Sequence, residues 1–260
     1  MQEACDVLDL LRAHRSERAF TGTPVSDDTL EHVFDAARRS PTWNNAQNVS
    51  WVVVRHAETR ARLAAFCGNQ AWIAKTPACV VLLMDFHKTA LAARKQGRDQ
   101  VVHHDVNSLL IGGVDTGIVM ATMMTAARAL GLDVCPIGGV RRQMQDVIDL
   151  LELPPLVVPM AGICVGYAET RSSLPKPRFD LAASWHDEVY RDHALADAID
   201  TLDARMHDYS QALGRPDAQN WSDAISSRYA VPTYTTVAAT LVRQGFRFPM
   251  PTAEGTAPNP

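Results

Sequence analysis

The chain has 260 residues, of which 47% are hydrophobic and 21% are charged, and its formal net charge at pH 7 is −4. This length and composition predict an ordinary globular protein with one large domain, or one domain with appendages, whose core needs no disulfide or metal. The pI near 6.1 excludes a dedicated nucleic-acid binder, for which a strongly basic balance is expected.

Patterns typical of helices and of strands alternate along the chain. The expected helices span 7–13, 27–40, 59–66, 102–130 and 144–151, and the expected strands span 51–54, 78–84, 134–137 and 160–165. Ser26 is expected to cap the second helix, and Gly131 to end the longest one. A helix-rich section follows over 186–245. Strands that alternate with helices in this way indicate an α/β or α+β fold with a central sheet.

The cysteines predict neither disulfides nor a zinc site, because they are scattered, odd in number and never spaced as C-x-x-C. They are Cys5, Cys67, Cys79, Cys135 and Cys164. The adjacent His103 and His104 would point about 100° apart on a helix, so we expect no metal there. The acidic N-terminus is unlike a signal peptide, and the apolar segment 109–127 contains Asp115. We therefore expect a buried helix, no membrane span and a cytoplasmic protein.

Two basic clusters are candidates for binding an anion. Residues 14–18, His-Arg-Ser-Glu-Arg, place an imidazole, two guanidiniums and a hydroxyl within five positions. Arginine forks match the oxygens of a phosphate or carboxylate, and a serine hydroxyl can donate to the same anion. The second cluster is Lys-Pro-Arg at 176–178, far downstream. Each can instead be a solvated surface patch, since Arg and Lys are mostly exposed.

Two further segments can approach a ligand. The polar loop 40–47 carries amides and a hydroxyl that can read the edge of a planar heterocycle, or it forms an ordinary turn. The pair Gly138-Gly139 lets backbone come close to a ligand, although most such pairs are turns. Neither a Walker A motif nor a G-x-G-x-x-G after a strand is present. The chain also has no nucleophile motif. The basic clusters, the polar loop and the glycine pair together suit a redox cofactor with a phosphate tail.

The sequence closely resembles the flavin-dependent nitroreductase family, in particular its bacterial oxygen-insensitive NADPH nitroreductases and flavin reductases. The resemblance runs from about Leu10 to Phe246. It rests on ordered landmarks at 14–21, 40–47, 68–70, 112–116, 137–141, 162–167, 176–178 and 221–223. Each landmark is modest by itself, and together in this order they are specific.

The resemblance implies an α+β fold in which helices surround a central mixed sheet, in an interlocked homodimer. A single FMN-binding domain would span 1–248, with 186–248 as a helical excursion that serves the dimer and the active site. Residues 249–260 would form a Pro-rich flexible tail. The implied cofactor is FMN, the electron donor is NAD(P)H, and the partners are a second copy and small planar electron acceptors, with no nucleic acid and no membrane.

The resemblance also implies the cofactor-binding residues. The FMN phosphate and ribityl chain would be held by Arg15, Ser16, Arg18, Lys176 and Arg178, with His14 beside them. Pro41, Thr42 and Asn45 would lie near the isoalloxazine ring, and Gln70 at its pyrimidine edge. One side of the flavin would be lined by Pro136, Ile137, Gly138, Gly139 and Val140. A glycine N–H near N5 makes physical sense, because reduced flavin gains electron density there.

The implied mechanism is ping-pong: NAD(P)H reduces the flavin and leaves, and a nitroaromatic, quinone or free flavin then takes two electrons. No side chain is required as a catalytic acid or base, and no metal is implied. Segment 214–220 has one arginine where relatives carry several that are thought to recognise the 2′-phosphate of NADPH. At 231–232, Val-Pro stands where a further arginine is expected. The sequence therefore does not fix NADH against NADPH. Reductive dehalogenation, dehydrogenation or flavin cleavage on the same fold, or flavin binding without turnover, are alternatives.

Overall fold

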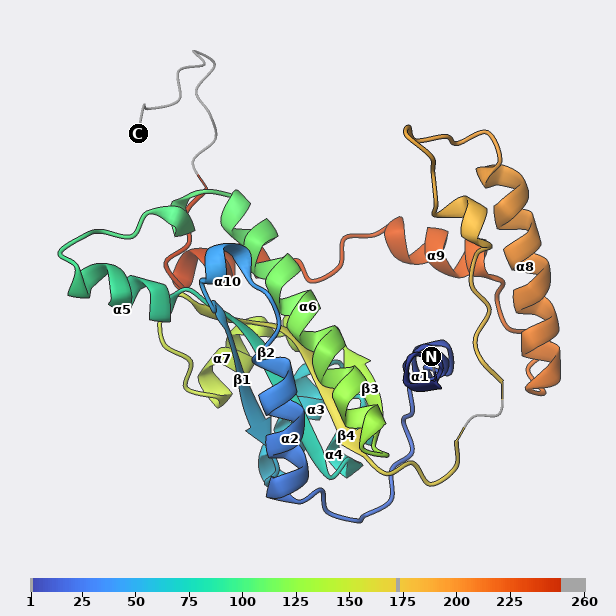
Figure 1. Ribbon diagram of the computed structural model, residues 1–260, viewed down its shortest axis with the longest axis horizontal. Coiled ribbons are helices and arrows are strands. Elements are labelled where there is room, and N and C mark those ends of the chain that lie inside the picture. Colours follow the sequence, from blue (N-terminus) through green and yellow to red (C-terminus); the bar gives the residue numbers. More distant parts are fainter. Residues whose placement is uncertain (1, 172–173, 249–260) are drawn as a thin grey trace. The chain divides into compact units, whose positions relative to one another are not determined.

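The computed structural model describes residues 2–171 and 174–248, which form two compact units (Figure 1). The first unit contains 2–12, 16–171 and 234–248 of these residues, and the second contains 13–15 and 174–233. The Pro-rich tail that the sequence predicts at 249–260 lies outside the described residues.

A four-stranded sheet lies at the centre of the first unit. Its strands are β1 (Val49–Val54), β2 (Ala78–Asp85), β3 (Asp133–Ile137) and β4 (Val157–Gly166), in the order β1-β2-β4-β3. The α+β class is confirmed. The three described pairs are all antiparallel, so the expectation of a mixed sheet is wrong for this part of the chain. Because β2 and β4 each run opposite to both of their neighbours, this strand order leaves no parallel pair among the described strands.

Helices cover both faces of this sheet. One face carries α2 (Asp27–Ala37) and α6 (Asn107–Ala129), which lie side by side, and the other carries α3 (Ala57–Phe66), α4 (Ala71–Lys75) and α7 (Met144–Leu150) (Figure 1). Strand β2 is buried throughout, with Val80 and Leu82 in the core under α2 and α6 and Val81 in the opposite core. An unbroken apolar run is what a strand covered on both faces requires.

The predicted start of the second helix is confirmed. Ser26 is extended and its hydroxyl accepts the Thr29 N–H at 3.1 Å, which satisfies one of the free donors at the helix start. The preceding helix, α1 (Gln2–Arg12), also ends where the sequence predicts, just before His14. The short helices α4 and α5 (His87–Lys95) were not predicted, because five and nine residues carry little periodicity.

The longest predicted helix begins later than expected. Helix α6 starts at Asn107, and 102–104 form a separate 3-10 turn, because the Asp105 side chain accepts the Asn107 N–H at 2.9 Å and competes with helical hydrogen bonding. At its other end Gly131 has a φ of +82°, a left-handed position that suits glycine. Among the described helices, α6 alone is long and apolar enough to cross a membrane, a test that core helices also pass. It packs against all four strands.

The second unit contains the helices α8 (Leu195–Ala212) and α9 (Trp221–Tyr229), in agreement with the predicted helix-rich section. Asp203 on α8 accepts the Ser222 N–H of α9 at 2.9 Å. Arg205 donates two hydrogen bonds to the Asp180 carboxylate, at 2.7 and 3.0 Å, and holds its pKa below the ordinary value. A further helix, α10 (Val237–Arg243), belongs to the first unit.

The buried cysteines give a testable expectation for thiol chemistry. Cys67, Cys79, Cys135 and Cys164 are free and buried, and burial raises the pKa of Cys67 to about 12. Because the thiolate is the reactive form, we expect these four thiols to resist a thiol-specific reagent at pH 8 in the native protein and to react in denaturant. A reagent titration measures this, and rapid reaction of two or more thiols in the native protein would contradict it.

Candidate functional site

The segment that carries the first basic cluster is fastened to the edge of the sheet. The Glu17 N–H donates to the Val134 carbonyl at 3.1 Å, and the Thr21 N–H donates to the Tyr167 carbonyl at 2.8 Å. Between them, Phe20 forms an isolated β-bridge with Ala168. The chain therefore runs beside β3 and the end of β4 because its own backbone pairs there.

Ser16 and Arg18 lie together at this edge. The Arg18 guanidinium is 5.9 Å from the centre of the Trp72 ring and donates to the Ser16 carbonyl at 3.2 Å. Burial raises the pKa of the Cys135 thiol on β3, whereas the Arg18 charge and a hydrogen bond with Ser16 lower it. The Arg18 side chain is exposed. Its remaining donors can therefore reach an anion from solvent, in a position fixed by an aromatic ring.

The other predicted phosphate ligands belong to the second unit, which contains both His14-Arg15 and Lys176 to Arg178. Arg15 donates to the Ala13 carbonyl at 2.7 Å. Arg178 donates to the Lys176 carbonyl at 2.9 Å, and both of these side chains are exposed. Two basic elements that are far apart in the sequence therefore fall within one compact unit.

The structure brings Gln70 and the glycine pair together. The Gln70 amide donates to the Cys67 carbonyl at 2.8 Å. A Cβ on Gly139 would lie 2.7 Å from that same carbonyl oxygen and 3.0 Å from the Gln70 amide nitrogen, so only glycine fits where these two loops meet. Gly138 beside it is exposed. Backbone that is open on one side and closely packed on the other suits contact with a flat ligand.

The neighbours of the glycine pair differ in what they can offer. Ile137 is 3% exposed and Val140 is fully buried, so their side chains belong to the core and only their backbone can reach a ligand. Pro136 is partly exposed. Of the five residues predicted along this side of the flavin, Pro136 and Gly138 are therefore the accessible ones, and Gly139 is buried.

The polar loop predicted to read a heterocycle adopts an unusual conformation. Asn44, Asn45 and Gln47 have φ values of 47°, 56° and 50°. These values lie in the left-handed region, which residues other than glycine and asparagine avoid. The Thr42 hydroxyl accepts the Gln47 N–H at 3.0 Å and closes the loop. Because asparagine tolerates this region, the strained residue is Gln47, and such strain persists where the surroundings impose it and is concentrated at functional sites.

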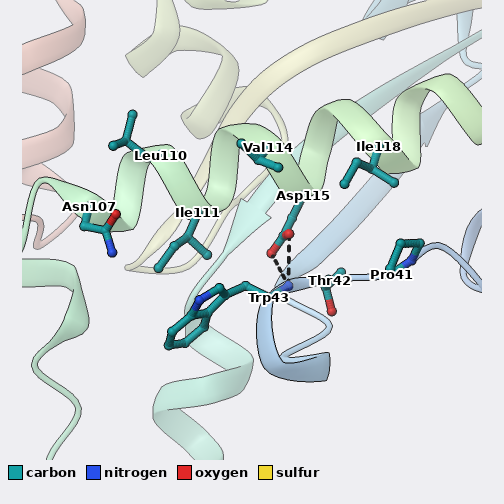
Figure 2. A pocket seen from close by; sticks show the side chains of 9 residues that line it. All are labelled: Pro41, Thr42, Trp43, Asn107, Leu110, Ile111, Val114, Asp115 and Ile118. Atoms are coloured by element: carbon teal, nitrogen blue, oxygen red, sulfur yellow. Dashed lines mark hydrogen bonds between the residues drawn. The ribbon is translucent and has the colours of Figure 1, made fainter. Parts of the chain in front are cut away.

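A buried carboxylate on α6 holds this loop. Asp115 is 2% exposed, and both of its oxygens accept the Trp43 N–H, at 3.0 and 3.2 Å (Figure 2). Beside this contact lies a pocket of about 430 Å³ between the loop and α6. Its lining residues are Pro41, Thr42, Trp43, Asn107, Leu110, Ile111, Val114, Asp115 and Ile118. The role of Asp115 was not predicted, and the only signal for it was a single acid within an apolar helix.

Replacing Asp115 with alanine is expected to loosen the loop, because the Trp43 N–H then loses the buried carboxylate that accepts it. We expect a loss of about 1–3 kcal/mol in the free energy of unfolding and faster amide exchange over 42–47. D115N keeps a carbonyl oxygen and is expected to lose less. D85N is the matched control, since Asp85 is 6% exposed and bonds Ser50 and the Lys88 N–H elsewhere. Unchanged exchange over 42–47 in D115A, followed by mass spectrometry, would refute this role.

Comparison with known proteins gives similarity along nearly the whole chain. The nitroreductase family model matches residues 11–167, and the model of the C-terminal domain of the same family matches residues 176–249. The FMN reductase (NAD(P)H) of Bacillus subtilis is 32% identical over 245 residues, which are 93% of this chain and 98% of that protein. The NADPH-flavin oxidoreductase of Vibrio harveyi is 30% identical over 227 residues, 86% of this chain and 91% of that protein.

The fold is similar to solved structures of the same kind. The structure of NfrA2 from B. megaterium superposes with a TM-score of 0.91 at 35% identity, covering 94% of this chain and 99% of that chain. The similarity therefore extends over both units and is not limited to a shared core.

Proposed function

Because this chain belongs to the nitroreductase family, we propose that it is an FMN-dependent NAD(P)H oxidoreductase that reduces nitroaromatics, quinones or free flavins. One observation of the structure supports this function most directly. A hydroxyl and an exposed cation, Ser16 and Arg18, lie beside Cys135, and the Gln70 amide meets Gly139 four residues further along the same chain segment. One edge of the sheet thus offers groups for a phosphate at one end and for a flat polar ring at the other.

The residues present fit FMN. Arg18 and Ser16 would hold the phosphate, and Gln70 would bind the pyrimidine edge of the ring. The closely packed Gly139 and the exposed Gly138 would let the ring lie against backbone. Bound FMN supplies the two-electron redox chemistry, so these residues need only bind it, orient it and keep one face accessible.

We propose that a second copy of the chain completes the site. The loop with Thr42 and Asn45 lies against α6. Trp43 of the loop and Leu110 and Val114 of α6 expose 53%, 65% and 61% of their surface there. Exposed apolar side chains gathered around a pocket are typical of a protein interface. In a homodimer, the loop of one copy could reach the flavin of the other. The mass in solution should then be twice the 28.5 kDa of the chain.

We also propose that both units form a single FMN-binding domain over 1–248, that 186–248 serves the dimer and the active site, and that the protein works in the cytoplasm. The continuous similarity to relatives across both units supports the first of these proposals.

A spectroscopic experiment tests the proposed function. The purified protein, mixed with FMN and freed of excess ligand, should keep a flavin spectrum that bleaches when NADH or NADPH is added anaerobically and recovers when a quinone is added. A protein that retains no flavin would refute FMN dependence. Flavin that binds but never bleaches would instead indicate a binding module without turnover. Comparing the bleaching rates with the two nucleotides would measure the donor preference.

A further inference from the structure

Arg141 directly follows the glycine pair and Val140, and the structure fixes its side chain from two directions. Its Nη1 donates to the Met160 carbonyl, and its guanidinium carbon is 5.5 Å from the centre of the Tyr234 ring. Tyr234 lies just before α10 and approaches from a distant part of the sequence within the same unit. A guanidinium stacked on an aromatic ring is held in place while its edge stays available for hydrogen bonding.

The polar ends of both side chains converge on Gly138. A Cβ on that exposed glycine would lie 3.5 Å from Arg141 Nη2 and 3.7 Å from the Tyr234 hydroxyl. Tyr234 has a φ of +55°, a conformation that is unfavourable for tyrosine. The strained backbone thus keeps a phenol and a guanidinium beside the open backbone of Gly138, as strain does at ligand sites.

The charge of Arg141 is not neutralised locally. Within 2–171 and 174–248, the cations of the ion pairs described are other arginines, one lysine and one histidine, and the one hydrogen bond from the Arg141 side chain goes to a carbonyl. Arg141 is partly buried. A partly desolvated guanidinium with no carboxylate partner attracts an anion more strongly than an exposed one.

We propose that Arg141, held by Tyr234, binds an anionic oxygen group of a substrate beside Gly138. The proposal rests on the proposed function, because it places this group next to the backbone that would face the flavin. Two sources share the chemistry. One is a carboxylate or sulfonate on the electron acceptor, and the other is the pyrophosphate of the nicotinamide nucleotide.

The test compares R141Q with the wild type and with R94Q, which removes the same charge from an exposed position on α5. Because a ping-pong cycle separates its two half-reactions, kcat/KM can be measured for each substrate alone. The acceptor pair is 4-nitrobenzoate against neutral nitrobenzene, and the donor pair is NADH against reduced nicotinamide riboside, which has no phosphate. We expect R141Q to lower kcat/KM for the anionic member of one pair about tenfold to a hundredfold, with the neutral member within about twofold.

Variants of Tyr234 test the stacking separately. Y234F keeps the ring and should keep the preference for the anion. Y234N removes the ring but tolerates a left-handed backbone, and it should lose part of that preference. The proposal would be overturned if R141Q changed kcat/KM equally for the anionic and the neutral member of each pair, or changed it for neither member. For each variant, the ratio of kcat/KM for the anionic substrate to kcat/KM for the neutral one is measured on the flavin-containing fraction. Turnover of the neutral substrates by the bound flavin then shows that the proposed function stands even where this inference fails.

Discussion

R18A is expected to weaken FMN retention by about tenfold or more, because a charge-assisted hydrogen bond to a phosphate contributes about 1.5–3 kcal/mol. Arg18 is suited to this contact because Trp72 and the Ser16 carbonyl hold its guanidinium, while the side chain stays exposed to solvent. Its removal leaves the sheet edge intact, since the backbone of Glu17 and Thr21 makes the pairing. The loss is therefore one of affinity and not of folding.

The FMN dissociation constant, measured by titrating the apoprotein and following flavin fluorescence, checks this expectation. R94A is the control, because Arg94 is exposed on α5 and belongs to neither basic cluster. R18K should recover part of the affinity, since it restores the charge without the two-pronged geometry. Equal dissociation constants for R18A, R94A and the wild type would mean that the phosphate is held elsewhere.

G139A is expected to reduce the free energy of unfolding by about 1–3 kcal/mol, because inserting a methyl group into closely packed structure forces the backbone to shift. The new Cβ would lie 2.7 Å from the Cys67 carbonyl oxygen, a backbone atom that cannot rotate away. It would also press on the Gln70 amide at 3.0 Å. The shift should separate the two loops and lower flavin retention together with stability.

G138A is the matched control for stability. A Cβ there meets only side-chain ends, at 3.5 Å from Arg141 and 3.7 Å from Tyr234, and the φ of −82° is ordinary for alanine. Denaturant unfolding of both apoproteins gives the comparison. If G139A proved as stable as G138A, the contact between the two loops would not be the tight one described above.

Local rules made much of the fold predictable from the sequence. Ser26 caps a helix through its own hydroxyl, and the apolar run in β2 requires cover on both faces, so each element can be recognised from a few residues. The predicted start of α6 was wrong, because the Asp105 side chain, and not the apolar pattern, decides where helical hydrogen bonding begins.

The candidate site was only partly predictable, because its geometry depends on long-range pairs. Asp115 bonds the Trp43 N–H across 72 positions, and no short window contains both residues. The stacking of Arg141 on Tyr234 joins still more distant segments. The glycine pair was recognisable as backbone open to a ligand, but its fit against Gln70 required the fold. The assignment of individual cofactor contacts stays a prediction.

The strand order has a consequence for what happens when the protein is heated. Ser16, Arg18 and the glycine pair, which are among the groups proposed to bind FMN, lie along or just after β3, an edge strand of the described sheet, whereas β2 lies inside the sheet and is buried on both faces. Local opening starts where fewest buried contacts must break, so an edge strand exchanges its amide protons before a central one. Release of the cofactor can then precede loss of the core. Such an order would leave a folded apoprotein that is able to take up FMN again on cooling.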